Sequence, residues 1–315
     1  MQKKIIFILT FLFSCSKIPD AVGINNEIII LSSLNDKDSI KDKITDLFSI
    51  YLKTPTDEPI YILKWIDPLN FKEFSTHKNI FAVSLDEPKD STVDYLFSQF
   101  DFKKNDDSAI FTLNNFYSSG QTFIFLNSTN SNEFGKSLKD YGQFVLNEFN
   151  ENIEKNIYEN YLKNNKNLDL SKIINDKYSL SIQIDENYLS IKENSDFLWI
   201  GRGYPYRWLI FDIADNVNDL DIWSIYIKSI SENVTGLNIS PHYRSESVDD
   251  NFFILRGVYD YDESDTGGPF FVYVFDNYID NSLILVSGFV SNPGKDKYLL
   301  LKELELLIKN IKGKI

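Results

Sequence analysis

Arginine and tryptophan are concentrated in one part of this sequence, and their chemistry suits the binding of an anion. Only four of the 32 basic residues are arginines, and three of the four tryptophans, Trp199, Trp208 and Trp223, lie in the same part of the chain. The arginines are Arg202, Arg207, Arg244 and Arg256. A planar guanidinium grips a carboxylate or phosphate with two parallel bonds, which a lysine ammonium does not do. Two interpretations stay open: an aromatic-walled cleft for an anionic ligand or partner, or structural ion pairs with acids such as Asp212 or Asp249.

The residues needed for nucleophilic or cofactor chemistry are sparse. The chain has two histidines: His77 lies in a polar loop and His242 follows Pro241 in another loop, which predicts surface positions for both. No G-x-S-x-G elbow, H-E-x-x-H pair or Walker loop occurs, and no G-x-G-x-x-G follows a predicted strand. Gly201-Arg-Gly203 runs into Tyr204-Pro205, which is typical of a turn. We therefore expect no catalytic residue and no cofactor.

The densest group of carboxylates runs from Asp260 to Asp265, just before Gly267-Gly268-Pro269. Oxygen ligands at alternating positions suit calcium, but this run lacks the internal glycine and the closing glutamate of an EF-hand loop. We interpret it as a solvated hairpin turn and expect the Gly-Gly-Pro step to bend the chain. The sequence predicts no metal site.

The first fifteen residues resemble a secretory signal that ends in a lipid-modified cysteine. A basic start precedes an apolar run from Ile5 to Phe13, about half the roughly 20 residues of a spanning helix. Leu12-Phe13-Ser14-Cys15 resembles the lipobox of bacterial lipoproteins, in which the cysteine carries a diacylglycerol. Because Cys15 is the only cysteine, an intramolecular disulfide is excluded. We predict a signal peptide over 1–14 and lipidation of Cys15.

Net charge excludes one class of partner. The chain carries −14, and loss of Lys3 and Lys4 with the signal peptide takes it to −16. Nucleic-acid binding depends on neutralisation of phosphates by Lys and Arg, so we do not expect a nucleic-acid partner. The same charge repels anionic head groups, which leaves the lipid on Cys15 as the predicted membrane contact.

The remaining chain is predicted to form two domains of the α+β class, each with a mixed or antiparallel sheet packed by a long C-terminal helix. A lipidated tether, 15–26, leads into the first domain, 27–165. A continuous apolar run, Ile28 to Leu31, predicts a strand buried on both faces. A long helical stretch, Asn132 to Asn164, closes this domain and is expected to break near Asn150.

The polar segment 166–176 is the predicted linker to the second domain, 177–315. Alternating apolar residues over Tyr178 to Ile184 predict a half-buried strand. A helix over Lys297 to Lys312, with Asp296 as its N-cap, is expected to close the chain.

Several motifs of the second domain also occur in a known family. They are Asp196-Phe-Leu-Trp199, Arg256-Gly-Val-Tyr259, Gly267-Gly-Pro-Phe-Phe-Val-Tyr273 and Gly288-Phe-Val-Ser-Asn-Pro293. With them the chain resembles a family of lipoproteins of unknown function found mainly in Bacteroidetes-type bacteria. The resemblance extends along most of the chain, although 91–107 matches poorly. It implies a lipid-anchored envelope protein and brings no activity, ligand or catalytic residue.

The sequence thus predicts a non-enzymatic lipoprotein of the bacterial cell envelope. We expect it on the periplasmic face of the outer membrane, held by lipid on Cys15. Its C-terminal domain would bind an envelope protein or a small anionic ligand. Two alternatives stay open: a hydrolase that uses carboxylates, and a structural subunit of an envelope assembly.

Overall fold

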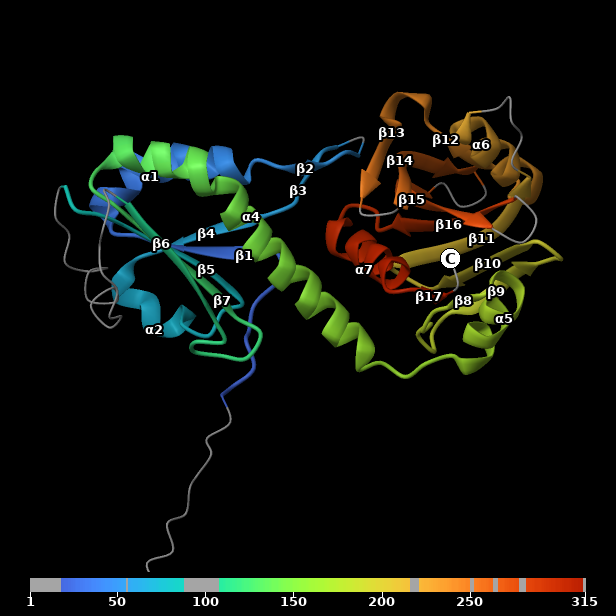
Figure 1. The fold of residues 1–315 in the computed structure, drawn as a ribbon, viewed down its shortest axis with the longest axis horizontal. Coiled ribbons are helices and arrows are strands. Elements are labelled where there is room, and N and C mark those ends of the chain that lie inside the picture. Colours follow the sequence, from blue (N-terminus) through green and yellow to red (C-terminus); the bar gives the residue numbers. More distant parts are fainter. Residues whose placement is uncertain are drawn as a thin grey trace, which may run out of the picture.

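The chain forms two α+β domains that lie side by side, which confirms the predicted fold class (Figure 1). The computed structural model describes residues 18–54, 56–87, 108–215, 221–249, 252–262, 266–277 and 282–313. The predicted signal peptide, 1–14, and Cys15 lie outside the described residues, as do two acids of the predicted hairpin turn, Glu263 and Asp265.

The first domain is built on a five-stranded sheet in the order β4-β1-β5-β7-β6. All strands are parallel except β6, which pairs with β7 in the antiparallel sense. Ile28 to Leu31 are fully buried, as expected for a central strand of a sheet covered on both faces. The elements are β1 (Glu27–Leu31), α1 (Leu34–Phe48), β2 (Tyr51–Leu52), β3 (Glu58–Pro59), β4 (Ile62–Ile66), η1 (Pro68–Asn70), α2 (Phe71–Phe74), β5 (Asn79–Leu85), β6 (Ser108–Asn114), β7 (Thr122–Ser128) and α4 (Ser131–Leu162).

The long helix α4 closes this domain without interruption over 32 residues. Its apolar side, which includes Val145 and Phe149, packs with α1 on one face of the sheet. The break expected near Asn150 is wrong, because the side-chain oxygen of Asn150 accepts the Tyr61 hydroxyl at 2.7 Å while the helix continues.

The second domain contains an eight-stranded antiparallel sheet in the order β12-β14-β15-β16-β11-β10-β9, with β13 paired to β14. Helix α6 covers one face, and α5 and α7 cover the other. The elements are α5 (Leu168–Tyr178), β8 (Leu180–Ser181), β9 (Leu189–Glu193), β10 (Phe197–Arg202), β11 (Tyr206–Asp215), α6 (Ile222–Asn233), β12 (Leu237–Ile239), η2 (Pro241–Tyr243), β13 (Ser245–Asp249), β14 (Phe252–Tyr261), β15 (Thr266–Asn277), β16 (Ser282–Ser291), α7 (Tyr298–Lys309) and β17 (Lys312–Gly313).

The segment read as a linker, 166–176, instead contributes most of helix α5. The Asn167 side chain caps this helix by accepting the backbone N–H of Leu170 at 3.0 Å, and Leu170 and Ile174 are buried in the core of the second domain. Burial alternates over Tyr178 to Ile184 as expected, but only β8 joins a ladder there. Gly267-Gly268-Pro269 lies inside β15 and does not bend the chain.

Helix α7 joins the two domains. It packs beneath the sheet of the second domain, yet Leu306 is buried in the core of the first. Figure 1 shows α7 between α4 and that sheet. The ammonium of Lys302 lies 3.0 Å from the Glu154 carboxylate on α4, so the junction contains both apolar contacts and an ion pair.

Candidate functional site

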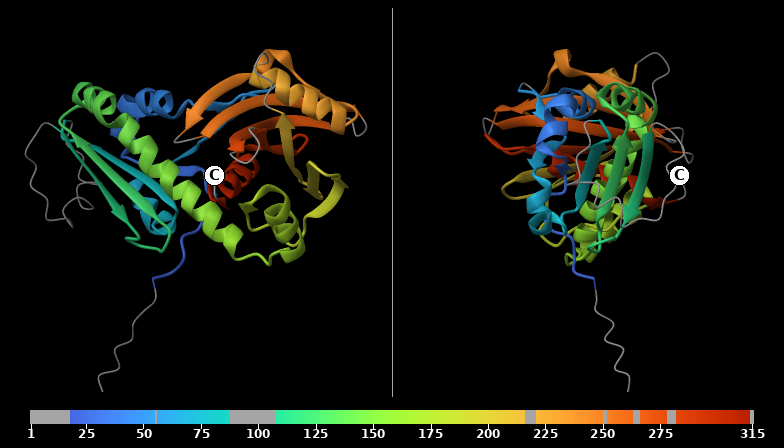
Figure 2. Two further views of the ribbon diagram at one scale, coloured as in Figure 1. Left: turned by 45° about the vertical axis from the view of Figure 1, so that its right-hand side comes forward. Right: turned by 90° about the vertical axis from the view of Figure 1, so that its left-hand side faces the viewer.

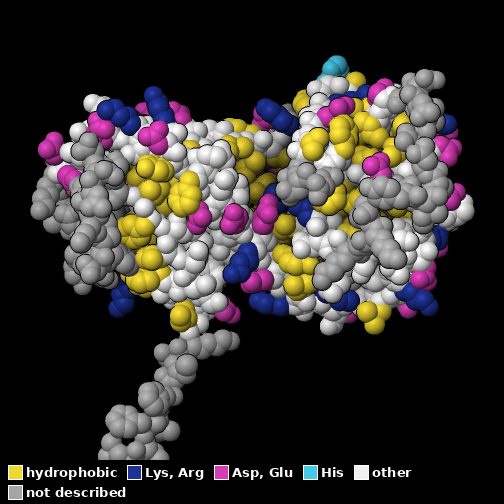
Figure 3. Space-filling view, in the orientation of Figure 1, with side chains coloured by type: hydrophobic (Ala, Val, Ile, Leu, Met, Phe, Trp, Pro, Cys, Tyr) yellow, Lys and Arg dark blue, Asp and Glu magenta, His cyan; other side chains and the backbone are white. Residues whose placement is uncertain are grey.

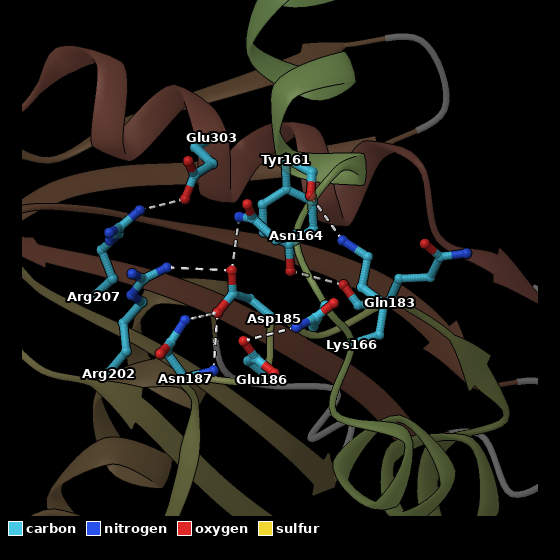
Figure 4. A network of polar contacts seen from close by, with 11 residues as sticks. Tyr161, Asn164, Lys166, Gln183, Asp185, Glu186, Asn187, Arg202, Arg207 and Glu303 are labelled. Atoms are coloured by element: carbon cyan, nitrogen blue, oxygen red, sulfur yellow. Dashed lines mark hydrogen bonds and ion pairs between the residues drawn. The ribbon is translucent and has the colours of Figure 1, made fainter.

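Arg202 and Arg207 are paired across the β10–β11 hairpin and point to the sheet face that α5 and α7 cover. Arg207 is buried and bonds to Glu303 of α7. Arg202 lies 3.6 Å from Asp185, which is only 1% exposed. Figure 4 shows both ion pairs. These two arginines are therefore parts of the scaffold.

Asp185 is the centre of this polar network. One oxygen accepts the backbone and side-chain N–H groups of Asn187, and the other accepts the side-chain amide of Asn164 at 2.7 Å. Burial alone would raise the pKa of the Asp185 carboxyl, but the bonds from Asn187, the Arg202 charge and the bond from Asn164 together lower it. Because Asn164 lies two residues after the end of α4, Asp185 ties the end of the first domain to the second.

Trp199 and Trp208 pack on the opposite face of the sheet, in the core that α6 covers. Their ring centroids lie 5.4 Å apart, edge to face. The sheet itself separates them from Arg202 and Arg207, so these four residues form no common cleft. Asp212, one of the expected partners for an arginine, instead accepts the Ser229 hydroxyl.

Two cavities of about 750 and 480 Å³ adjoin between the domains, and Tyr243 lines both. The hairpin β2–β3 and its flanking residues form the wall from the first domain. The opposite wall comes from η2, from β14 and β15, and from α7 or the loop before it.

The larger cavity has a carboxylate from the other domain at the start of α7. One Glu58 oxygen accepts the backbone N–H of Lys297 at 2.7 Å, and the other accepts the Lys297 ammonium at 2.6 Å. Asp296 was predicted to cap α7, but the N-cap residue of this helix makes no side-chain capping bond. Glu58 instead accepts a backbone N–H at the start of the helix. Asp260, another carboxylate of this cavity, accepts the Asn238 amide at 3.0 Å.

We expect Glu58→Ala to lower the free energy of unfolding by about 2 kcal/mol, because it leaves a largely buried ammonium and an orphaned helix N–H. Urea unfolding at neutral pH measures this loss. The adjacent Asp57→Ala is the control: Asp57 is exposed and, among the described residues, pairs with exposed Lys53, so its loss should stay below about 0.5 kcal/mol. Equal losses in the two variants would show that the contact between Glu58 and Lys297 does not stabilise the junction between the domains.

The smaller cavity is cationic, in contrast to the larger one. Glu305 of α7 lies between two of its cations: it accepts two bonds from Arg256, at 2.9 and 3.2 Å, and lies 3.5 Å from Lys302. Burial would lower the pKa of Lys302, but Glu305, Tyr298 and Glu154 raise it above its usual range, so this side chain stays charged. The charged residues that line the cavity are Lys53, Arg244, Arg256, Lys302 and Glu305.

Arg244 differs from the other three arginines. Its guanidinium lies over the Trp223 ring, 5.2 Å from the centroid, and it pairs with no carboxylate of the described residues. Stacking on an indole holds the planar group in place while its N–H donors stay available. Arg244 and Arg256 both line the smaller cavity, so the structure brings together two of the four predicted arginines.

The wall residues from the first domain were missed in the sequence. From sequence, Tyr51 is the last apolar residue of a predicted helix and Lys53 follows it before the exit loop. Lys302 and Glu305 are ordinary residues of a predicted amphipathic helix. The one available signal was the use of arginine in a chain whose basic residues are otherwise lysines. It identifies Arg244 and Arg256 but not the other residues that line the cavity.

Across the described ranges, no three His, Cys, Asp or Glu side chains are placed to hold a metal ion. In the same ranges, no helix is both long and apolar enough to span a membrane.

Comparison with known proteins divides the chain at the same place as the structure. Residues 21–162 match a family described as domain of unknown function DUF8532, and residues 167–310 match domain of unknown function DUF4837. No curated protein matches. Two solved structures are similar at 8% identity: the Saccharomyces cerevisiae Ran-binding protein Mog1p, with TM-score 0.32 over 43% of this chain and 92% of that chain, and a mutant of protein Mog1, with TM-score 0.31 over 42% and 90%. Both halves of the chain therefore match uncharacterised families.

Proposed function

We propose that this protein is a non-enzymatic binding protein of the bacterial cell envelope, and that its smaller interdomain cavity takes an anionic group of the ligand. The observation that carries the proposal is the charge of that cavity. Four cationic side chains and one carboxylate line it, in a protein whose net charge is −14. A volume of about 480 Å³ lies within the range of roughly 300–1,000 Å³ that small-molecule sites occupy.

The anion would meet Arg244 first. Among the described residues, the Arg244 guanidinium pairs with no carboxylate, so an anion can bind it without breaking an ion pair. Arg256, in contrast, is already paired with Glu305. Tyr51, Tyr243 and Phe270 supply apolar walls, which lower the local dielectric and strengthen a charged bond. An anionic ligand bound there would contact both domains.

The membrane attachment in this proposal rests on the N-terminal sequence. Cleavage before Cys15 and acylation of its sulfur and new amino terminus would hold the protein on the periplasmic face of the outer membrane. Each buried CH₂ contributes about 0.8 kcal/mol, and more than one acyl chain gives stable attachment.

Titration with inorganic phosphate and with succinate, followed by amide chemical shifts, tests the cavity. We expect Arg244→Gln to weaken binding by about tenfold, the loss of one charged contact of about 1.4 kcal/mol, with no change in melting temperature. Lys228→Gln, on the exposed side of α6, is the matched control and should bind like the wild type. Shifts that are absent from the cavity, or equal affinities in both variants, would contradict the proposal.

A further inference from the structure

The segment that follows Cys15 is not a free tether over its whole length. From Pro19 onward it is bonded to the end of the first domain: the Ala21 N–H donates to the Ser119 carbonyl at 2.8 Å, and the Val22 N–H donates to Thr76 at 3.0 Å. The Lys78 ammonium adds a bond to the Gly23 carbonyl at 2.9 Å. The expected tether, 15–26, is therefore largely part of the folded domain.

These contacts fix the end of the domain that lies nearest to Cys15. Three residues separate Cys15 from Pro19, and a chain extends by at most about 3.6 Å per residue, so Cys15 lies within roughly 15 Å of the first fixed residue. The nearby structure is the end of the sheet at which β1, β5 and β7 begin. A lipid on Cys15 would hold this end, and not another, against a bilayer.

Apolar side chains are exposed at this end of the domain. Ile18 is 46% exposed, Val22 49% and Phe116, in the loop between β6 and β7, 38%. Figure 3 shows hydrophobic side chains where the described chain begins, at the lower end of the first domain. Ile18, Val22 and Phe116 are thus exposed apolar side chains at the end of the domain that a lipid on Cys15 would hold against a bilayer.

The end of the first domain and the start of the second continue this side of the molecule. Leu162, at the end of α4, is 43% exposed, and Leu168, at the start of α5, is 75% exposed. The helix α4 ends on the same lower side from which the N-terminal segment leaves (Figure 2).

We propose that this surface, formed by Ile18, Val22 and Phe116 and flanked by Leu162 and Leu168, lies against the lipid bilayer. The inference rests on the lipid anchor of the proposed function and adds an orientation to it. The occupant is a lipid surface because the acylated residue is within a few residues of the patch. The hairpin β2–β3, which walls the interdomain cavities, lies on the upper side of the molecule, away from the N-terminal segment (Figure 1). In this orientation the cavities face the periplasm and stay open to ligand.

The full-length lipoprotein, purified from host membranes, allows a direct test. Intact mass first establishes the lipid on Cys15. Because Cys15 is the only cysteine and its sulfur is then blocked, an introduced cysteine is the single free thiol. Phe116→Cys and Val22→Cys place an environment-sensitive fluorophore on the surface. Leu34→Cys is the control: Leu34 is 66% exposed but follows the far end of β1.

The labelled proteins are placed in vesicles of phosphatidylethanolamine and phosphatidylglycerol, with and without acyl-brominated lipid. We expect bromine to cause a several-fold loss of emission at positions 116 and 22 and almost none at position 34. If the mass shows the lipid but all three labels are quenched alike, the surface is wrong while the anchor stands. A mass without the lipid overturns the anchor and the orientation together.

Discussion

Replacing Gly268 with alanine should lower the free energy of unfolding by about 3–5 kcal/mol, far more than one added methyl group normally costs. Gly268 lies in β15, and a Cβ there would be 2.1 Å from the carbonyl oxygen of Val290 on β16. That oxygen belongs to backbone, so it cannot move aside as a side chain would. The two central strands would have to separate locally, and the wall of the larger cavity with them.

Gly203→Ala is the matched control, because no atom lies within 4 Å of a Cβ built at that position. Its effect should stay within about 0.5 kcal/mol. Urea unfolding of both variants, followed by circular dichroism, measures the difference. Should Gly268→Ala cost less than about 1 kcal/mol, the close approach of β15 and β16 is wrong.

The elements that could be predicted from sequence are those whose burial is set by local pattern. The apolar run Ile28 to Leu31 forms a central strand because both of its faces are covered. The spacing of Val145, Phe149 and Ile153 places one side of α4 on the core. Patterns of this kind report which side chains leave water, and that holds in any tertiary arrangement.

Features set by a partner far along the chain could not be read in this way. Glu58 meets the start of α7 across 239 residues, so nothing near Asp296 shows that another residue binds there. The alternating apolar residues over Tyr178 to Ile184 correctly predict which side chains are buried, but they do not predict strand pairing. An extended segment that lies on a core buries every second side chain whether or not it pairs with a neighbouring strand. Helix α5 could not be predicted because an asparagine-rich stretch precedes it, although one of these residues, Asn167, caps the helix.

The candidate site was only partly predictable. The preference for arginine identified Arg244 and Arg256, and it equally selected Arg202 and Arg207, which form ion pairs within the scaffold. One exclusion was available from the sequence alone. Arg207 and Trp208 are neighbours in a strand, and neighbouring side chains point to opposite faces of a sheet, so they cannot line one cleft.

Asp185→Ala should be the second large loss, about 3–4 kcal/mol at neutral pH. Removal of one partner of a buried ion pair leaves the other charge without compensation, and here the amides of Asn187 and Asn164 also lose their acceptor. The neighbouring Glu186→Ala is the control, because Glu186 is exposed and its carboxylate accepts a long bond, at 3.2 Å, from the Asn165 amide. Equal losses would show that the network in Figure 4 is not a structural centre.

The unfolding free energy lost in Asp185→Ala should also depend on pH, and the direction follows from the lowered pKa of Asp185. The folded state lowers the pKa of Asp185 below the value of about 3.9 that an unfolded aspartate has. The carboxylate therefore stabilises the fold fully above the unfolded pKa, and this contribution is lost as pH falls through the folded pKa. Unfolding free energies of wild type and Asp185→Ala should converge as the pH falls below about 4, whereas the small difference for Glu186→Ala should stay small throughout. A gap for Asp185→Ala that keeps its neutral-pH size under acid would mean that lost packing, and not the charge, stabilises this junction between the domains.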